Sequence, residues 1–594
     1  MLNRNFKLYA FGALISLLFL VIVGLSAPHP VKMVFVLVGG LNTYRYAAGA
    51  MREKELIDAI RGKVTYRVTY DDLPVDRLLI GKGFMWTPAH SKKVNLLMQD
   101  KEMLEQGAAL GGLSFIHGIG ISEERDIHVP LDDLVGHMIV MGTTRVGKTR
   151  GYEIAVVQPV KRGETVVIFD PKGDAGLLNR TVEACRRYGR EKDFIFFALP
   201  YPRLSAYYNP LKNFTLPNEI PDRIAMLLPS GGSSDSFRAF SWQVISAINN
   251  ALLFLGERPT IRSLYDYSLN KMDSLCCKCI EKAFNNKGIL SVLEDFMEER
   301  NIDSVSKRIE LYVALYKKHH EVQNGMIDDL VSLASHPREH FQKMIASLTP
   351  TLAKLATGEI GHILSETPRD GVGIDWEIVA KKKKVVYMFF GSLLLGDTAR
   401  YVIRMAMQDF RSYVGARYSY EPNMEPINLF IDEFTEVVDS SSANLINKCG
   451  GAQVRVTLAS QSEADIEAEL GSSAKAQQIF DNLNTKLWMR NSDISTAQVF
   501  SNAAGTITVQ QEGSGFSVSP DMSDNDIVFR SSYSRSVSEK AVPLIDPSWM
   551  LKLPKGQGFL ISSGRVYKVR IPLLQDCKVN YLEELGIHDT KVFE

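Results

Sequence analysis

The sequence predicts an α/β fold in which a phosphate-binding loop adjoins a parallel β-sheet and an all-helical segment interrupts that sheet. Three observations support this prediction. An apolar run leads into the pattern G-x-x-x-x-G-K-T at Gly142–Thr149. Continuous β-branched and aromatic runs, typical of parallel strands buried on both faces, occur on either side of a long middle stretch. That stretch, from about 259 to 355, shows helical periodicity and little strand signal.

The composition limits the classes of protein to consider. At 594 residues the chain exceeds the size of a single core, so two or more domains are expected. Hydrophobic residues make up 45% and charged residues 23%, which is ordinary for a globular protein. Lys and Arg together number 68, as do Asp and Glu, so the net charge is zero. Any DNA-facing surface must therefore be local.

Six cysteines are too few for a disulfide scaffold and suit a reduced compartment. Cys276, Cys277 and Cys279 lack a second ligand pair at zinc spacing, and a helix there would point the thiols in different directions, so a metal site is disfavoured. His336 and His340 are interpreted as surface histidines, because no metalloprotease pattern surrounds them.

The chain begins with an apolar segment, Leu8–Leu25, which carries no charge and is about long enough to cross a bilayer as a helix. A signal peptide is the competing interpretation. It is disfavoured because Gly24–Ala27 is a poor cleavage site and because export would separate the phosphate loop from cytoplasmic ATP.

A second apolar segment, Val31–Leu41, is followed by Tyr44 and Tyr46 as interfacial aromatics and could return the chain across the membrane. Basic residues precede the first segment and follow the second, so both ends of the hairpin are expected on the cytoplasmic side. These basic residues are Arg4, Lys7, Arg45, Arg52 and Lys54. The sequence thus predicts a transmembrane hairpin with spans at about 8–25 and 30–46.

Alternating apolar and polar residues at Val64–Val68 and the run Leu78–Ile80 predict strands that lead into the nucleotide-binding domain. In the loop that follows, glycines allow a tight turn whose N–H groups face phosphate oxygens, Lys148 reaches the β- and γ-phosphates, and Thr149 ligates Mg²⁺. A chance glycine-rich turn is the alternative. The candidate nucleotide-binding residues are Gly142, Thr143, Thr144, Arg145, Val146, Gly147, Lys148, Thr149 and Arg150.

Beyond the loop, residues 151–160 suit a helix and Thr165–Phe169 suits a buried strand. This strand ends in Asp170–Asp174, at the edge of an open α/β sheet where ligands bind. Phe194–Leu199 predicts another strand. A serine- and glycine-rich loop then precedes a helix at Phe237–Leu255, and the helical insertion follows.

The α/β pattern resumes after the insertion. Lys381–Lys384 precede a strand that extends to Phe390. These lysines could contact DNA, but a charge run that protects an aggregation-prone strand is the favoured interpretation. A long helix is predicted at Asp397–Tyr418.

The apolar run Ile427–Ile431 ends in Asp432 and Glu433. An ATPase needs such a pair opposite its phosphate loop, because Asp432 can hold Mg²⁺ and Glu433 can orient and deprotonate the attacking water. A helix-capping aspartate would look similar, but the loop at Gly142 favours the catalytic interpretation. The helical insertion accounts for the long separation between this pair and Lys148.

One more strand, Val454–Ser460, ends at Gln461. An amide there could contact the γ-phosphate or its water and act as a sensor, and an ordinary strand-terminal polar residue is the alternative. The serine-rich segment Glu512–Lys540 fits a pore loop, a subunit-contact loop or disorder, and composition does not choose among them.

These features occur in one order: the GTTRVGKT loop, the FDPKGD strand end, Tyr208–Leu211, the helical insertion, the FIDEF and LASQ strands, and the amino-terminal hairpin. Together they resemble the type IV secretion coupling proteins of bacterial conjugation, the TraD/TraG family, especially the branch from integrating conjugative elements. The resemblance covers nearly the whole chain. It implies a RecA-like P-loop ATPase core with an inserted all-α domain and an N-terminal transmembrane helical hairpin.

With this resemblance the chain divides into a membrane anchor (1–60), a first part of the nucleotide-binding domain (61–240), an inserted all-α domain (241–369) and a second part of the nucleotide-binding domain (370–594). The resemblance implies a homo-hexameric ATPase in the bacterial inner membrane, multi-pass and mostly cytoplasmic. It implies that ATP and Mg²⁺ drive the delivery of relaxase-bound single-stranded DNA from relaxosome proteins to the type IV secretion channel.

Carried over by motif, Lys148 and Glu433 are catalytic with Gln461 as the sensor, and Thr149 and Asp432 are the Mg²⁺ ligands. Relatives often place an arginine in the turn before the sensor strand to reach a neighbouring subunit. This chain instead has Lys448-Cys449-Gly450-Gly451 there. Either Lys448 or Arg455 could substitute, or the finger could come from elsewhere.

Two other functions fit the sequence less well. A double-stranded DNA translocase of the FtsK/HerA type would use the same motor, but the two-span anchor and the position of the insertion argue against it. A membrane receptor or adaptor that docks protein substrates without pumping DNA is the other alternative, and Glu433 argues against an inactive enzyme.

Overall fold

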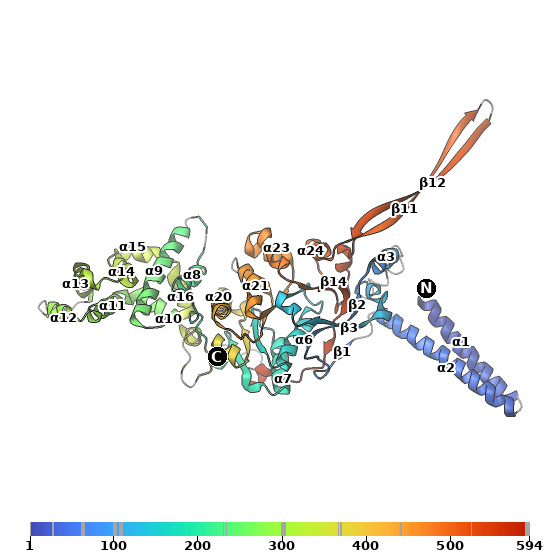
Figure 1. Ribbon diagram of the computed structural model, residues 1–594, viewed down its shortest axis with the longest axis horizontal. Coiled ribbons are helices and arrows are strands. Elements are labelled where there is room, and N and C mark those ends of the chain that lie inside the picture. Colours follow the sequence, from blue (N-terminus) through green and yellow to red (C-terminus); the bar gives the residue numbers. More distant parts are fainter. Residues whose placement is uncertain are drawn as a thin grey trace.

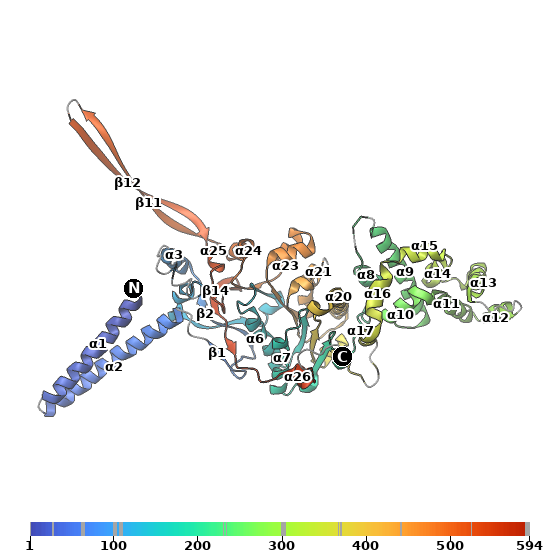
Figure 2. The same ribbon diagram turned by 180° about the vertical axis from the view of Figure 1, so that it is seen from behind.

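The computed structural model describes residues 2–26, 29–60, 66–98, 104–105, 111–229, 231–232, 234–298, 305–365, 368, 371–439, 442–523 and 526–587. Figure 1 shows three parts: a helical domain at one end, a sheet-containing body in the middle, and a helical hairpin and a long β-ribbon that project from the other end. The view from behind shows the same separation (Figure 2).

The body is built on one mixed sheet of eleven strands in the order β3-β2-β14-β13-β10-β4-β9-β8-β5-β7-β6. In this order, the strands that stand from β10 to β6 run parallel to one another. The other four, β3, β2, β14 and β13, extend the sheet with antiparallel pairing. The strands are β2 (Arg77–Met85), β3 (Arg125–Pro130), β4 (Met138–Met141), β5 (Thr165–Asp170), β6 (Phe194–Ala198), β7 (Val385–Phe389), β8 (Ile427–Ile431), β9 (Val454–Ser460), β10 (Thr485–Met489), β13 (Gln557–Ser562) and β14 (Arg565–Arg570). A short parallel pair, β1 (Arg67–Val68) and β15 (Leu573–Leu574), lies outside this sheet.

The parallel part of the sheet is fully covered. All residues of β4, β5, β7 and β8 are buried, which explains why their sequences are mostly apolar instead of alternating between apolar and polar residues. The helices of the body are α3 (Pro88–Leu97), α5 (Phe115–Gly118), α6 (Lys148–Lys161), α7 (Ala175–Arg187), α18 (Trp376–Lys381), α19 (Ser392–Leu395), α20 (Asp397–Tyr420), α21 (Ser442–Cys449), α22 (Glu463–Leu470), α23 (Ser473–Asp481), α24 (Ile494–Ala504), α25 (Pro547–Met550) and α26 (Tyr581–Glu584). Helix α8 (Glu219–Ala225) lies beside the helical domain, where the chain leaves the body (Figure 1). The predicted α/β core is therefore confirmed.

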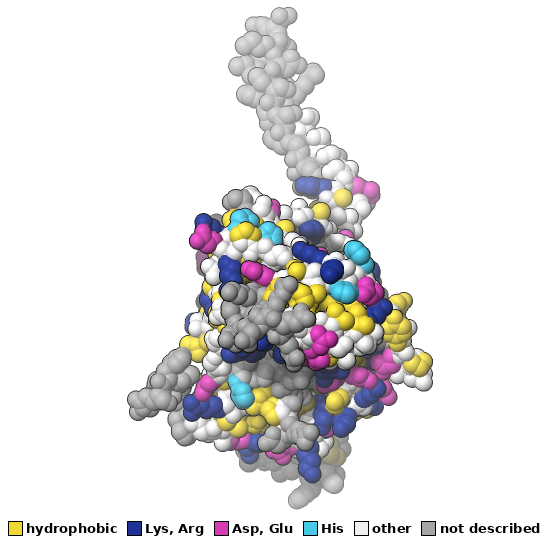
Figure 3. Space-filling view, turned by 90° about the vertical axis from the view of Figure 1, so that its left-hand side faces the viewer, with side chains coloured by type: hydrophobic (Ala, Val, Ile, Leu, Met, Phe, Trp, Pro, Cys, Tyr) yellow, Lys and Arg dark blue, Asp and Glu magenta, His cyan; other side chains and the backbone are white. Residues whose placement is uncertain are grey.

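The predicted helical insertion is also present, between β6 and β7. Its helices are α9 (Ser234–Leu255), α10 (Ile261–Asp266), α11 (Met272–Asn286), α12 (Leu290–Glu298), α13 (Val305–Lys318), α14 (Gly325–Ala334), α15 (Arg338–Met344), α16 (Leu348–Ala356) and α17 (Gly358–Ile363). The three clustered cysteines lie on a helix, α11, as predicted, and all three are buried. His336 and His340 are exposed, as predicted, and their rings stack on each other. Basic and acidic side chains are interspersed on the face at this end of the molecule (Figure 3). The exact domain limits remain predictions.

The amino-terminal residues form a hairpin of two helices, α1 (Leu2–Ser26) and α2 (His29–Ile60). The predicted pair of helices is thus present, with bounds longer than the expected spans. Within the described residues, however, no helix combines the length and apolar character that a membrane crossing requires.

The serine-rich segment takes a form that the sequence did not predict. Two long strands, β11 (Thr506–Ser523) and β12 (Asp526–Pro543), pair in antiparallel register from Thr506↔Pro543 to Ser523↔Asp526. The ribbon projects away from the body beyond α24 (Figure 1).

Candidate nucleotide-binding site

The phosphate loop joins the carboxyl end of β4 to the start of α6. Gly147 has a φ of 103°, a left-handed conformation that glycine adopts without strain, and it immediately precedes α6. A Cβ on Gly142 would meet Val146 at 3.0 Å and Met489 at 3.1 Å, so the first glycine is needed for close packing. Arg145 is also left-handed, with a φ of 62°, although it is not a glycine. Strained backbone of this kind is concentrated at functional sites.

The acidic pair lies at the same edge of the sheet. Strand β9 lies between β4 and β8, so the ends of all three parallel strands are neighbours. Asp432 follows β8 directly, and its N–H donates to the carbonyl of Phe169 at 3.0 Å. Glu433 has a φ of 53°, which is a strained conformation for a residue with a side chain. This turn directs the chain from β8 into a short 3₁₀ helix, Phe434–Glu436.

The three predicted catalytic residues converge. The Glu433 carboxylate accepts a hydrogen bond from the Gln461 amide at 2.9 Å through Oε1, and its Oε2 lies 3.7 Å from Nζ of Lys148. The Lys148 ammonium is mostly buried and makes no hydrogen bond within the described part of the chain. A buried ammonium without hydrogen-bond acceptors is suited to an anionic ligand, because each of its N–H groups otherwise remains unpaired.

These residues line one cleft of about 980 Å³. The sequence-predicted residues in its wall are Thr143, Thr144, Arg145, Gly147, Lys148, Thr149, Arg150, Asp432, Glu433 and Gln461. Gly142 and Val146 do not line the cleft. Val146 is buried, and its carbonyl accepts the N–H of Gly556 at 2.7 Å, so it fixes the loop to the sheet.

The carboxylate of Asp432, which lines the cleft, is electrostatically coupled to the fully buried carboxylate of Asp170. Burial, followed by the charge of Asp170, raises the pKa of Asp432 to about 7, although Lys148 lowers it. Burial raises the pKa of Asp170 to about 6 against the hydrogen bonds that its carboxylate accepts from Tyr387 and from the N–H groups of Gly173 and Asp174. Two crowded carboxylates make a site where a divalent cation would be favourable. The hydroxyl of Thr149 and the carboxylate of Asp432 have the oxygen chemistry that Mg²⁺ prefers.

Several lining residues were not assigned a role from the sequence, among them Glu153, Lys172 and Asp174. Glu153 lies on α6 and contacts Arg150 at 3.1 Å and Arg180 at 3.4 Å. The spacing of three residues between Arg150 and Glu153 was the signal in the sequence for their ion pair. The contact with Arg180 had no such signal, because Arg180 lies on another helix, α7. Asp174 caps α7 by accepting from the N–H of Gly176 at 2.7 Å.

The two candidates for a residue that reaches a neighbouring subunit, Arg455 and Lys448, lie in different environments. Arg455 lies near the amino end of β9, opposite the cleft, and pairs with Glu164 at 3.0 Å within the chain. Lys448 is exposed on α21, shortly before the sensor strand.

Three lysines of the run at 381–384 have acidic neighbours. Lys381 pairs with Glu377, Lys383 with Glu425 and Lys384 with Asp193. These ion pairs partly neutralise the charge of the run, and its role in protecting the following strand from aggregation stays a prediction.

Residues 426–555 match a protein-family model described as the TraM recognition site of TraD and TraG. This match confirms the predicted resemblance to the TraD/TraG family over a segment that contains β8, Glu433 and Gln461. A search of curated protein sequences found no match.

Solved structures with similarity to the chain include the bacterial conjugative coupling protein TrwBdeltaN70, with 15% identity, a TM-score of 0.49, and coverage of 77% of this chain and 90% of that chain. TrwB in complex with the ATP analogue ADPNP shares 16% identity at a TM-score of 0.47, over 76% of this chain and 89% of that chain. VirB4 of Thermoanaerobacter pseudethanolicus shares 13% identity at a TM-score of 0.39, over 73% and 88%. All three TM-scores are below 0.5, so the fold assignment rests on the sheet order and loop geometry given above.

Proposed function

We propose that the chain is a conjugative coupling ATPase with a RecA-like motor, which hydrolyses ATP to deliver relaxase-bound single-stranded DNA to a type IV secretion channel. The observation that carries the proposal is the convergence of Lys148, Glu433 and Gln461 on one cleft. The family match over residues 426–555 supports the assignment to conjugation.

In this proposal the N–H groups of the phosphate loop and the ammonium of Lys148 hold the β- and γ-phosphates. Glu433 orients and deprotonates the attacking water, and Gln461 senses whether the γ-phosphate is present. Thr149 and Asp432 would hold Mg²⁺, which neutralises phosphate charge when bound. Solved structures of TrwB contain ADPNP in one case and ADP with Mg²⁺ in another, and we propose the same ligand class here.

The active form is proposed to be a homo-hexamer in which a basic residue of a neighbouring subunit completes each site. Such a residue would stabilise charge on the transferred phosphoryl group. Lys448 is the favoured candidate, because it is exposed while Arg455 is paired with Glu164 inside the chain. DNA would be bound mainly through its backbone inside the ring, which is compatible with a net charge of zero.

Attachment to the inner membrane is also proposed, with the body of the chain on the cytoplasmic side. Helix α1 leaves many apolar side chains exposed, including Phe11, Leu14 and Leu18, each more than 60% accessible. Apolar surface of this extent is unfavourable in water and is typical of a region that contacts a membrane or a partner. Recovery of the full chain, but not of a chain without residues 1–51, in a carbonate-washed membrane fraction would support attachment.

The test of the motor is ATP hydrolysis by the purified full-length protein with and without single-stranded DNA. We expect DNA to stimulate hydrolysis, and we expect Lys148→Ala and Glu433→Gln each to abolish it and to abolish conjugative transfer. Glu433→Gln should still bind nucleotide, whereas Lys148→Ala should not.

Absence of stimulation, together with normal transfer by both variants, would contradict the motor and favour a receptor that docks protein substrates. Stimulation by double-stranded DNA alone would favour a translocase of the FtsK/HerA type.

A further inference from the structure

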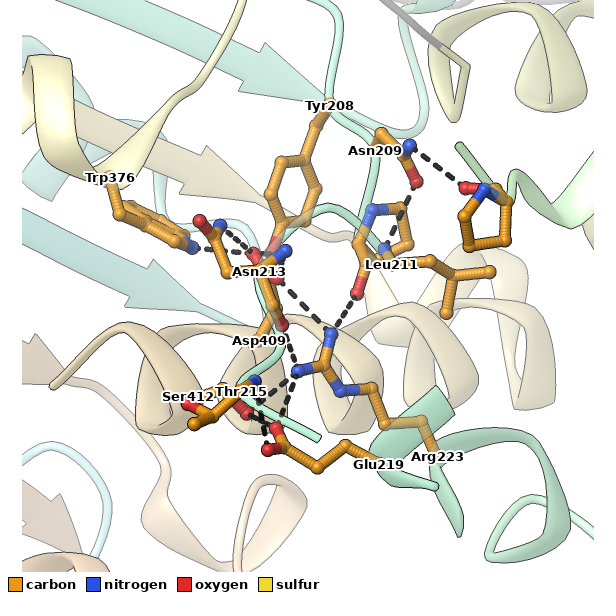
Figure 4. Close-up of polar contacts among 12 residues, drawn as sticks. Tyr208, Asn209, Leu211, Asn213, Thr215, Glu219, Arg223, Trp376, Asp409 and Ser412 are labelled. Atoms are coloured by element: carbon orange, nitrogen blue, oxygen red, sulfur yellow. Dashed lines mark hydrogen bonds and ion pairs between the residues drawn. The ribbon is translucent and has the colours of Figure 1, made fainter. Parts of the chain in front are cut away.

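A buried carboxylate joins the motor to the helical insertion. Asp409 on α20 is fully buried, and its carboxylate accepts hydrogen bonds from the Tyr208 hydroxyl at 2.9 Å, the Trp376 indole at 2.7 Å, the main-chain N–H of Asn213 at 2.9 Å and the Arg223 guanidinium at 3.2 Å (Figure 4). Loss of one partner from such a group is costly, because the charge then stays buried with fewer donors.

The donors come from both connections between the motor and the helical domain. Arg223 lies on α8, which leads out toward α9, and Trp376 begins α18, which follows the return from α17. The guanidinium of Arg223 also donates to the hydroxyl of Ser412, one turn further along α20, at 2.7 Å. Both connections between the motor and the helical domain are therefore held by hydrogen bonds to one segment of α20.

The amino-terminal part of α20 contacts segments that follow the predicted catalytic residues. Arg400 lies 3.6 Å from Glu436, in the 3₁₀ helix that begins directly after Glu433. Arg404 lies 3.6 Å from Glu469 on α22, the helix that follows the sensor strand β9. These pairs are partly exposed and individually weak, as suits contacts that form and break between two states.

An α-helix rises 1.5 Å per residue, so Arg400 and Asp409 are separated by about 14 Å along a single stiff element. We propose that α20 couples the helical domain to the segments that carry Glu433 and Gln461, so that nucleotide binding and the position of the helical domain depend on each other. This inference rests on the proposed function of the cleft. Arg400 and Arg404 are positioning residues in it, and Asp409 fixes the helical domain to the same helix.

The experiment is hydrogen–deuterium exchange of the full-length protein with and without the slowly hydrolysed probe Mg²⁺–ATPγS. In the wild type we expect the probe to change backbone exchange in residues 219–255 and 371–381, although no described residue of either segment lines the cleft. In the double variant Arg400→Gln/Arg404→Gln, the Kd for the probe should stay within about threefold of wild type while that exchange difference falls by at least half.

Arg411→Gln is the matched control, because Arg411 lies on the same helix and pairs with no carboxylate among the described residues; it should retain the full response. The conservative Arg400→Lys/Arg404→Lys variant should show a larger exchange difference than the double Gln variant, because lysine keeps the positive charges. The double Gln variant should also lower kcat for ATP more than it changes KM.

The possible failures are distinguishable. If the wild type does not bind the probe, the proposed function fails and the inference fails with it. If the wild type binds the probe without any exchange difference in residues 219–255 and 371–381, the coupling is overturned while the proposed function stands. The same conclusion follows if the double Gln variant keeps the full difference.

Discussion

The side-chain amide of Gln461 donates a hydrogen bond of 2.9 Å to the carboxylate of Glu433, although the two residues follow different strands, β9 and β8. The same carboxylate lies 3.7 Å from the ammonium of Lys148 through its other oxygen. A carboxylate held on both sides in this way has a defined orientation. A γ-phosphate that binds Lys148 would compete for one of these contacts, so Glu433 and Gln461 are placed to respond to it.

Replacing Gln461 by alanine should lower kcat for ATP by about 10- to 100-fold, because the orientation of Glu433 is lost while Glu433 itself remains. The Kd for Mg²⁺–ATPγS should change by less than about threefold. Gln477→Ala is the matched control, since Gln477 lies on the exposed face of α23 and bonds only Asp481 within the described residues. Equal kcat values for the Gln461 variant and the wild type would refute a sensing role.

Excision of the β-ribbon should leave the body folded. Thr508 and Ala541 are paired across the two strands, so a two-residue Asn-Gly turn between them would close a short hairpin in place of residues 509–540. Tyr533 and Val537 of this region are exposed, and Val509 is only partly buried, so none of these three side chains belongs to the core of the body. We expect a thermal midpoint within about 2 °C of wild type and unchanged nucleotide binding. A drop of more than 5 °C would show that the ribbon supports the body.

The parallel core could be predicted from the sequence because burial on both faces dictates its residue types. Val454–Ser460 was predicted with the bounds that β9 has, and the phosphate loop has a spacing that its chemistry fixes. The pairing of the serine-rich strands could not be predicted, because glycine and serine give no period-two signal. The left-handed turn at Glu433 was equally hidden, since backbone strain leaves no pattern in the residue types.

Long-range polar contacts could not be predicted from the sequence either. Asp409 lies on a helix of mixed composition and gives no sign in the sequence that it collects donors from segments up to about 200 residues away. Likewise, the effect of Asp170 on the pKa of Asp432 depends on β5 and β8 being adjacent strands. Only the fold brings these groups together.

Neighbouring tyrosines offer a test of the junction at Asp409. The hydroxyl of Tyr208 is buried and bonds Asp409, whereas that of the adjacent Tyr207 bonds His362 near the surface. Tyr208→Phe should lower the free energy of unfolding by about 2 kcal/mol, since it removes a donor from a buried carboxylate. Tyr207→Phe should cost less than about 0.5 kcal/mol. Chemical denaturation of both variants, followed by tryptophan fluorescence, would measure the difference, and equal losses would contradict the role given to Asp409.

His117 should make the free energy of unfolding depend on pH below neutrality. Its ring is fully buried on α5, and Nε2 lies 2.8 Å from the carboxylate of Glu124. Burial lowers the pKa of His117 to about 4 in spite of that carboxylate, and Lys568 and Arg570 add to the lowering. The unfolded chain, with a pKa near 6.5, therefore binds more protons than the folded chain between pH 6.5 and 4.

Stability should consequently be constant with respect to this group above pH 6.5 and should fall as the pH drops toward 4, by up to about 3 kcal/mol. The His117→Gln variant keeps a hydrogen-bond donor for Glu124 but cannot be protonated, so its stability should fall less over the same interval. Denaturation of both proteins at pH 7.5, 6, 5 and 4, followed by tryptophan fluorescence, to which Trp86 and Trp549 of the adjoining aromatic cluster contribute, would test this. Because the two proteins share every other ionisable group, parallel curves would exclude His117 as the source of the pH dependence.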